Sequence, residues 1–353
     1  MNGKTTTATD SEPAGWFETT RLEAWMRRHV DGFEGPIEVA KFPGGQSNPT
    51  FRLTTPRRQY VLRRKPPGKL LKGAHAVERE YRIISALGPL DFPVPRTWGL
   101  CEDDEVVGTP FFVMDMVPGR IFWDPKFPEV PRAERGAYYD SMCATIARLH
   151  RIDYEAAGLA DYGRPGNFVE RQIGIWSRQY LQDEVAGRIE AMDRLTEWLP
   201  GHIPDDGSPT CVVHGDFRCD NLIFHPTEPR VVAVLDWELS TLGHPLADFT
   251  YHLMNYRLPP SLPAGMAGAD FAALGLPSEA DYTAAYCRHT GRQDIPDLDF
   301  YLAFNMFRLA AIIHGVKGRL LRGNASSDRA EQLVAYLGDL AESAWRQAQM
   351  AGA

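Results

Sequence analysis

The stretch from Val212 to Asp236 constrains the fold of this 353-residue chain more than any other. It begins as a short apolar run that ends in His214-Gly215-Asp216, and Asn221 follows five residues after the aspartate. A second apolar run, Val231 to Leu235, ends on Asp236. Short apolar runs bounded by turn residues indicate buried strands. The sequence therefore predicts two strands that each lead into a loop bearing an acidic side chain.

Oxygen-bearing side chains in this order fit the transfer of a phosphoryl group. That reaction needs a carboxylate that orients and deprotonates the attacking hydroxyl, and oxygen ligands for Mg²⁺. Because Mg²⁺ keeps several of its waters, few protein ligands suffice. We expect Asp216 to be the base and Asn221 and Asp236 to be the metal ligands. A strand-ending turn could contain the same residue types, but the spacing and the second strand argue against that interpretation.

The chain before about residue 118 differs in pattern from the chain after it. The first part contains short β-rich segments punctuated by glycine and proline, with one apolar repeat of helical spacing between them. The predicted strands are Ile37–Phe42, Thr50–Thr54, Gln59–Arg64, Thr97–Cys101 and Pro110–Val117, and the predicted helix is Ala74–Leu87.

After Pro118-Gly119 the pattern is mainly helical. The predicted helices are Arg132–Arg151, Glu279–His289, Leu298–Lys317 and Asp328–Met350. A chain of this length suits about two domains. We therefore expect a partly disordered leader at residues 1–30, a β-rich N-lobe at 31–117 that binds ATP, and a helical C-lobe at 118–353 with the catalytic loop and acceptor site.

The composition is that of an ordinary globular protein, with 44% hydrophobic and 24% charged residues. No apolar run reaches the ~18 residues that a membrane-spanning helix needs. The five cysteines are scattered without a C-x-x-C pair, which argues against a zinc ribbon or a disulfide framework and suits a reducing cytoplasm. A net charge of −8 gives no reason to expect nucleic-acid binding. We expect a cytoplasmic protein; the sequence leaves its oligomeric state open.

The central motif also resembles that of a known family. His-Gly-Asp-x-x-x-x-Asn, followed by an apolar strand into Asp-Trp, resembles the Brenner-type motif of aminoglycoside phosphotransferases and choline kinases, which are relatives of protein kinases. The resemblance extends from about Ile37 to about Leu340. More narrowly, Tyr60–Gly68, Ala74–Tyr81 and Gly108–Arg120 resemble the kinase-like domain fused to acyl-CoA dehydrogenases and its stand-alone bacterial relatives.

This resemblance implies an α+β, protein-kinase-like two-lobed fold with a small antiparallel-sheet N-lobe and a larger, mostly helical C-lobe. It implies an ATP- and Mg²⁺-dependent phosphotransferase that phosphorylates a hydroxyl of a small molecule. His214 and Asp216 would form the catalytic part of the motif. Asp248 resembles the buried aspartate that braces the catalytic loop in the family.

The phosphate-binding loop should lie between the first two predicted strands, where Gly44-Gly45-Gln46-Ser47-Asn48 occurs. Gly44 and Gly45 would let backbone N–H groups approach phosphate oxygens, and Ser47 and Asn48 would add donors. A plain hairpin turn is the alternative. Neither G-x-G-x-x-G nor G-x-x-x-x-G-K-[ST] is present, which disfavours Rossmann and Walker A sites.

The third strand should supply a cation for the α- and β-phosphates. The family often has lysine there, whereas Arg63 occupies the matching position, with Lys65 as the alternative candidate. Arginine can hold phosphate oxygens with two donors, but it is not equivalent to lysine. Glu80 on the following helix would be its partner. The resemblance further implies that the backbone C=O of Asp115 and the N–H of Val117 bind adenine.

The acceptor should bind the C-terminal helices. The segment Phe300–Ala325 contains Arg308, Lys317, Arg319 and Arg322 and no acidic residue. Such a segment suits an anionic acceptor, although cations near a helix end also complement the helix dipole. The narrower resemblance points to a hydroxyacyl-CoA or a hydroxy acid.

Three other hypotheses stay open. The chain could be an aminoglycoside or other amino-alcohol kinase, or a nucleotide-binding pseudokinase module, which the Arg63 departure favours. The third is a metallohydrolase, which would use His214, Asp216, Asp236 and His244 but would need more histidine ligands at metal spacing.

Overall fold

The computed structural model describes residues 16–42, 48–68, 75–323 and 328–353. The chain divides into two compact units that do not follow the sequence order. Unit 1 contains Met1–Trp123, Ala157–Leu159 and Cys219–Ser240, and unit 2 contains Asp124–Ala156, Ala160–Arg218 and Thr241–Ala353. The segment at 219–240, which the sequence division placed in the C-lobe, thus belongs with the N-terminal residues.

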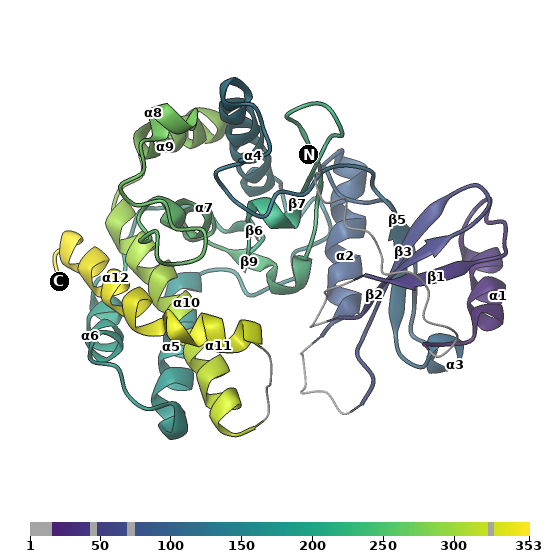
Figure 1. Ribbon diagram of the computed structural model, residues 1–353, viewed down its shortest axis with the longest axis horizontal. Helices are drawn as coiled ribbons and strands as arrows, with labels where there is room; N and C mark the ends of the chain where they lie inside the picture. The colour runs from purple at the N-terminus through teal and green to yellow at the C-terminus, as the bar shows by residue number, and fades with distance from the viewer. Residues whose placement is uncertain (1–15, 43–47, 69–74, 324–327) are drawn as a thin grey trace. The chain divides into compact units, whose positions relative to one another are not determined.

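Unit 1 is built on a five-stranded antiparallel sheet with the strand order β1-β2-β3-β5-β4 (Figure 1). Its strands are β1 (Glu38–Lys41), β2 (Thr50–Thr54), β3 (Gln59–Arg64), β4 (Thr97–Cys101) and β5 (Phe111–Asp115). The five strands predicted from the sequence are confirmed to within a few residues, because short runs of β-branched and aromatic residues favour a pleated, half-buried surface.

One face of this sheet packs against helix α1 (Thr19–His29). Side chains alternate between the two faces of a strand, so Phe51 and Leu62 point to the same side and are buried with Trp25 of the helix. The predicted leader of residues 1–30 thus includes a helix of the hydrophobic core, and residues 1–15 lie outside the described chain.

The opposite face packs against helix α2 (Val77–Leu87), which lies across the sheet from α1 (Figure 1). The rings of Tyr81 and Phe112 meet there with their centroids 6.1 Å apart. The short helix α3 (Asp104–Val107) joins β4 to β5. Helix α2 was predicted to begin at residue 74, but the structure describes it only from Val77.

A hairpin of β7 (Leu222–Phe224) and β8 (Val231–Val234) completes unit 1. Arg120 and Phe224 exchange two backbone hydrogen bonds of 2.8 Å, and the N–H of Val234 donates to Pro93 at 2.8 Å. Main-chain bonds therefore attach the hairpin to segments that lie more than a hundred residues earlier in the sequence.

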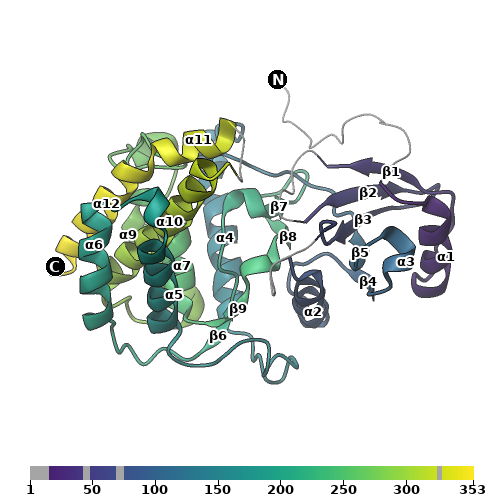
Figure 2. The same ribbon diagram turned by 90° about the horizontal axis from the view of Figure 1, so that it is seen from below.

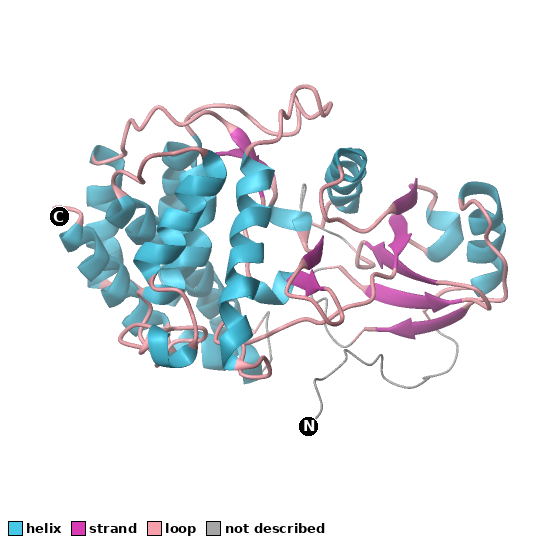
Figure 3. Cartoon of the chain, turned by 90° about the horizontal axis from the view of Figure 1, so that it is seen from above, coloured by secondary structure: helices cyan, strands magenta, loops and turns pink. Residues whose placement is uncertain are grey.

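Unit 2 is mostly helical, and Figure 3 shows how strongly helices predominate there. Its helices are α4 (Arg135–His150), α5 (Phe168–Gln182), α6 (Glu190–Trp198), α7 (Pro245–Leu253), α8 (Phe271–Leu274), α9 (Glu279–Thr290), α10 (Leu298–Leu321), α11 (Asp328–Ala335) and α12 (Leu337–Met350). The prediction of one helix from Asp328 to Met350 was wrong in one respect, since Tyr336 separates two helices.

Helix α10 is the centre of unit 2, and α5, α7 and α12 pack around it (Figure 2). A helix that is apolar on nearly all sides is expected to be buried. Its Asn305 is buried and donates to the C=O of Ala247 and to Thr250 Oγ1, each at 2.8 Å, which ties α10 to α7. No helix within the described ranges has both the length and the apolar character that crossing a membrane requires.

Two short strands position the central motif. β6 (Cys211–Val213) pairs antiparallel with β9 (Thr241–Gly243), with Val212 opposite Leu242. β6 leads into the motif, and β9 leads into α7, the helix that carries Asp248.

Candidate active site

A buried carboxylate holds the loop that follows β6. The backbone N–H groups of His214 and Gly215 both donate to Asp248, at 2.7 Å to Oδ2 and 2.8 Å to Oδ1. His150, at the end of α4, contacts the same Oδ2 through Nε2 at 3.1 Å. We call this arrangement the Asp248 clamp. The prediction that Asp248 braces the loop is confirmed.

The clamp acts as an ionised acceptor. Burial raises the pKa of Asp248, but its contacts with His150 and His214 lower it more, so the pKa lies below its ordinary value of 3.8. Hydrogen bonds from N–H groups to a carboxylate are about twice as strong as neutral ones. The main chain of the loop is therefore held by two charge-assisted bonds.

Asp216 follows the clamped residues and is partly exposed. The C=O of Gly215 accepts a hydrogen bond from Arg308 Nη2 at 2.8 Å, and Gly215 has a φ of 84°, which glycine adopts without strain. Tyr251 is hydrogen-bonded to Asp216, and burial together with the Asp216 charge raises the pKa of Tyr251. Arg218 Nε lies 3.6 Å from Asp216 Oδ1. The carboxylate thus extends from a main chain that two separate side chains fix.

His214, which was predicted to be catalytic, has no exposed surface. Its Nδ1 accepts the N–H of Asp216 at 3.2 Å, and its ring stands edge-on to Phe217. A ring in this position can fix the main chain of Asp216.

The two predicted metal ligands lie at the same end of the β7–β8 hairpin. Leu222 is paired with Val234, and just beyond this pair the N–H of Leu235 donates to the C=O of Asn221 at 2.9 Å. Asp236 therefore directly follows Leu235, the residue whose backbone is hydrogen-bonded to Asn221. Unit 1 thus brings the two residues together as the sequence order suggested.

Asp236 also takes part in a network with Arg63. Arg63 forms an ion pair with Glu80, 2.7 Å from Nε to Oε2, and donates from Nη2 to Asp236 Oδ1 at 2.8 Å. Asn48 is fully buried and donates from Nδ2 to Glu80 Oε1 at 2.8 Å. We call these residues the Arg63 network. The predicted pairing of Arg63 with Glu80 is present, and its contact with Asp236 was not foreseen.

The charges of the Arg63 network influence one another. Burial raises the pKa of Glu80 to about 7; Arg63 opposes this, and Asp236 and Glu238 add to it. Burial lowers the pKa of Arg63, but Glu80 and Asp236 raise it by more, so that the guanidinium is the more firmly charged member. Arg63 is therefore a cation that lies close to three carboxyl groups, those of Glu80, Asp236 and Glu238.

Residues 38–301 of the chain match the phosphotransferase enzyme family. This chain belongs to that family.

Curated relatives of this phosphotransferase are longer than the chain itself. Acyl-CoA dehydrogenase family member 10 from Mus musculus is 46% identical over 313 residues, which cover 88% of this chain and 29% of the relative. Acyl-CoA dehydrogenase family member 11 from Rattus norvegicus is 42% identical over 322 residues, which cover 90% of this chain and 41% of the relative. The chain spans less than half the length of these curated relatives.

Solved structures agree with the predicted α+β, kinase-like fold. A protein from Ralstonia eutropha JMP134, provisionally named an aminoglycoside phosphotransferase, has a TM-score of 0.87 and 50% identity over 95% of this chain and 99% of its own. Choline kinase from Cryptosporidium parvum Iowa II has a TM-score of 0.66 and 12% identity, over 94% and 97%. An aminoglycoside phosphotransferase in complex with ADP and hygromycin B has a TM-score of 0.60 and 14% identity, over 92% and 97%. The last two likenesses show the fold alone.

The two residues predicted to ligate the metal, Asn221 and Asp236, carry oxygen groups that suit Mg²⁺. Asp236 is 37% exposed through its side chain and presents a carboxylate beside the amide-bearing Asn221, and carboxylate and amide oxygens are ligands that hard cations accept. No group of three or more His, Cys, Asp or Glu side chains in the described part of the chain is arranged to hold a metal. The metallohydrolase hypothesis therefore gains no support.

The structure describes only some of the other residues that were predicted to contact the nucleotide. Gly44, Gly45 and Ser47 lie outside the described residues. Asp115 ends β5, and its side chain accepts a hydrogen bond from Trp98 Nε1 at 2.7 Å. The adenine contacts of Asp115 and Val117 stay predictions.

The structure separates Arg63 from its alternative candidate. Lys65 pairs with Glu78, 2.9 Å from Nζ to Oε2, and this pair does not include Glu80. Arg63 thus occupies the position in the network that the sequence analysis gave to the phosphate-binding cation.

Two of the four cations proposed for the acceptor are already engaged within unit 2. Arg308 is buried and bonds Gly215, and Arg322 forms a two-donor pair with Asp183 at 2.7 and 2.9 Å. The segment Phe300–Ala325 contains no acidic residue, but the fold brings Asp183, which follows α5, to Arg322. Arg308 and Arg322 therefore stabilise unit 2 in this structure.

Sequence reasoning missed three side chains that contact the central motif or its clamp, namely Tyr251, His150 and Arg308. Tyr251 lies three residues after Asp248, on the same face of α7, so helical spacing could have indicated it. His150 lies 98 residues before Asp248, and no local pattern marks it.

Proposed function

We propose that this phosphotransferase moves the γ-phosphoryl group of ATP, in a Mg²⁺-dependent reaction, to a hydroxyl of a small molecule. The observation that carries the proposal is the Asp248 clamp, which fixes the main chain from which Asp216 extends. A carboxylate fixed in this way suits a general base that orients the attacking hydroxyl and accepts its proton. His214 is buried, so we assign it the role of positioning Asp216.

The nucleotide would be held by residues of unit 1. Asn221 and Asp236 would ligate Mg²⁺, which when bound neutralises the charge of phosphate oxygens. Arg63 would hold phosphate oxygens through its two-donor fork. Since Arg63 now contacts Asp236, binding of the nucleotide would require the guanidinium to exchange this carboxylate for phosphate.

Further nucleotide contacts follow from the family and from the network. The backbone C=O of Asp115 and N–H of Val117 would bind adenine, and the loop with Gly44, Gly45 and Ser47 would cover the phosphates. Asn48 was predicted as a phosphate donor, but its bond to Glu80 supports a role in holding the partner of Arg63.

For the acceptor we propose a hydroxyacyl-CoA or a hydroxy acid. The support is the 40–46% identity to proteins named acyl-CoA dehydrogenase family members 10 and 11, of which the chain matches one part. The name of the Ralstonia protein favours an aminoglycoside as the second candidate acceptor.

The test is release of ADP from ATP and Mg²⁺ with a panel of hydroxyacyl-CoAs, hydroxy acids, sugars, amino alcohols and aminoglycosides. We expect acceptor-dependent release by the wild-type chain and none by the Asp216→Ala variant. Release with aminoglycosides alone would replace the proposed acceptor. Nucleotide binding without any acceptor-dependent turnover would instead support the pseudokinase hypothesis.

A further inference from the structure

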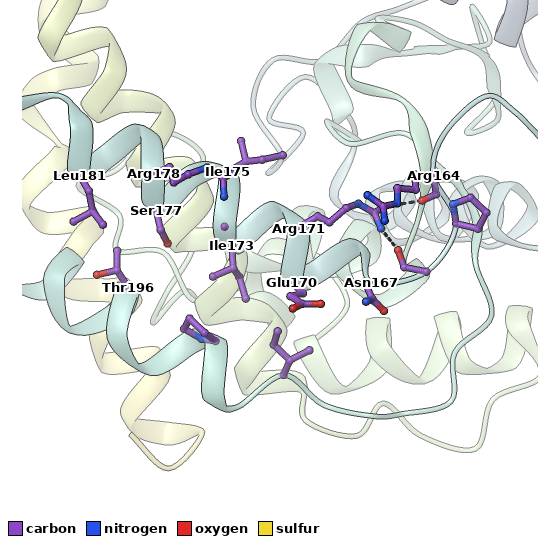
Figure 4. A pocket seen from close by; sticks show the side chains of 15 residues that line it. Arg164, Asn167, Glu170, Arg171, Ile173, Ile175, Ser177, Arg178, Leu181 and Thr196 are labelled. Atoms are coloured by element: carbon purple, nitrogen blue, oxygen red, sulfur yellow. Dashed lines mark hydrogen bonds between the residues drawn. The ribbon is translucent and has the colours of Figure 1, made fainter.

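A pocket of about 850 Å³ lies on unit 2 along helix α5 (Figure 4). Small-molecule sites commonly have volumes of roughly 300–1,000 Å³, so the pocket could hold a ligand of ordinary size. Its lining comes from α5, the turn before it and the segment from α6 to residue 203. The lining residues are Arg164, Pro165, Gly166, Asn167, Glu170, Arg171, Ile173, Gly174, Ile175, Ser177, Arg178, Leu181, Thr196, Pro200 and Ile203.

The charge of this lining is predominantly positive. It includes Arg164, Arg171 and Arg178, spaced seven residues apart, and Glu170 is its one acidic residue. Seven residues are close to two helical turns, so Arg171 and Arg178 lie on one side of α5. Figure 4 shows Arg178 toward one end of the labelled row and Arg164 toward the other.

The three arginines differ in how they are held. Arg171 donates to the C=O groups of Gly166 and Arg164, the latter at 2.6 Å, so its position is fixed by the turn before α5. Burial and the neighbouring Arg164 charge lower the pKa of Arg171, although Glu170 opposes this. The guanidinium groups of Arg164 and Arg178 make no ion pair or hydrogen bond with any described residue.

The rest of the lining is largely apolar. Ile173 is buried at the base, while Ile175 and Leu181 are 44% and 41% exposed, and Ile203 adds a further aliphatic side chain. Apolar surface beside unpaired guanidinium groups suits a molecule with both an anionic group and an apolar part. A polycation such as an aminoglycoside would be repelled by the same arginines.

The pocket is separate from the loop that carries Asp216. At the pocket, the N–H of Gly166 donates to Thr210 Oγ1 at 3.2 Å. Thr210 precedes β6, whereas Asp216 follows it. None of the described residues that line the pocket belongs to the segment from β6 to Arg218.

We propose that this pocket binds a phosphate- or carboxylate-bearing molecule with an apolar chain, through Arg164 and Arg178 and the aliphatic side chains beside them. The same chemistry could belong to the remote end of a long acceptor or to a separate ligand. The proposal does not depend on the identity of the phosphorylated hydroxyl.

The test is calorimetric titration of the full chain with octyl phosphate, inorganic phosphate and octanol. We expect octyl phosphate to bind more tightly than inorganic phosphate or octanol. It alone has both an anionic group for the arginines and an apolar chain for the aliphatic side chains. In the Arg164→Gln/Arg178→Gln variant its affinity should fall at least about 10-fold, the scale of losing one charge-assisted hydrogen bond. The matched control, Arg288→Gln, removes an exposed arginine of α9 and should bind as the wild type does.

Equal affinity of octyl phosphate for the wild type and the double variant, or no binding at about 1 mM, would overturn the proposal. Thermal melting of each variant checks that the fold is retained, and Arg171 is left unchanged because it bonds the main chain. Competition of octyl phosphate with an active acceptor would place that acceptor's anionic end in the pocket. Uncompetitive or absent inhibition with intact binding would assign the pocket to a separate ligand.

Discussion

The Asp248 clamp in unit 2 and the Arg63 network in unit 1 hold charged groups in opposite ways. The carboxylate of the Asp248 clamp accepts hydrogen bonds from two backbone N–H groups. Arg308, which is not part of the clamp, donates to the backbone C=O of Gly215 in the same loop. The Arg63 network bonds side chains only, from a strand, a helix and the end of the hairpin.

This difference distinguishes a fixed region of unit 2 from an exchangeable region of unit 1. A clamped main chain cannot give up its partners without local unfolding, because buried N–H groups without acceptors are costly. An arginine between carboxylates can exchange one of them for a phosphate at little cost, because both are anionic oxygen acceptors. The clamp should therefore control the rate of the chemical step, and the network should control nucleotide binding.

The largest effect should come from the residue that the clamp presents. Asp216→Asn should lower kcat at least about 10²-fold, because an amide cannot accept the proton of the hydroxyl. Its affinity for ATP, measured by calorimetry, should change little. A large loss of ATP affinity with kcat retained would break the division between the two regions.

Removal of the proposed metal ligand in the network should act on binding instead. Asp236→Ala should abolish the Mg²⁺-dependent part of nucleotide affinity, since it removes one of the two proposed protein ligands and the partner of Arg63. The matched control is Glu228→Ala, which removes an exposed acid from the same hairpin. Unchanged Mg·ATP affinity in Asp236→Ala would remove this residue from the metal site.

The clamp should also determine part of the acid stability. The pKa of Asp248 is lower in the folded chain than the ordinary 3.8, so its stabilising contribution is complete above that value and is lost as the pH falls through the folded pKa. Asp248→Asn should lower the free energy of unfolding at pH 7 by about 1–3 kcal/mol. Below about pH 4 the difference in the free energy of unfolding between the variant and the wild type should become smaller.

Denaturant titrations from about pH 3 to about pH 7, which span the ordinary aspartate pKa of 3.8, measure both effects. If the difference in the free energy of unfolding stayed constant over this pH range, the charge of Asp248 would contribute nothing to the clamp.

The smallest effect should come from a conservative change in the network. Arg63→Lys keeps one positive charge but loses the fork that contacts Glu80 and Asp236 together. We expect KM for ATP to rise about 3- to 10-fold, with kcat changing less. Lys65→Arg is the control, because Lys65 pairs with Glu78, and it should leave KM unaltered. If Lys65→Arg had the larger effect, Lys65 would become the phosphate-binding cation.

The sequence predicted best the features that depend on local pattern. The five strands of unit 1 and the order of Asp216, Asn221 and Asp236 follow from apolar runs and turn residues. Helix α1 was missed because it lies within residues 1–30, which were predicted to be a partly disordered leader, although Leu22, Trp25 and Met26 have helical spacing.

Long-range partners were the part that the sequence could not provide. His150 and Arg308 come to the catalytic loop from helices far along the chain, and no spacing rule connects them to it. The hairpin's assignment to unit 1 likewise depends on backbone bonds to Arg120 and Pro93 that only the fold supplies.

The assignment of the hairpin to unit 1 affects how the protein can be dissected. A fragment that stops at Trp123 would contain Arg63 and Glu80 but would lack Asn221 and Asp236, and the backbone of Arg120 would lose its partner Phe224. Such a truncation could not report on metal-dependent nucleotide affinity, whatever its solubility. A fragment meant to isolate unit 1 would need residues 219–240 joined back onto it by a designed linker.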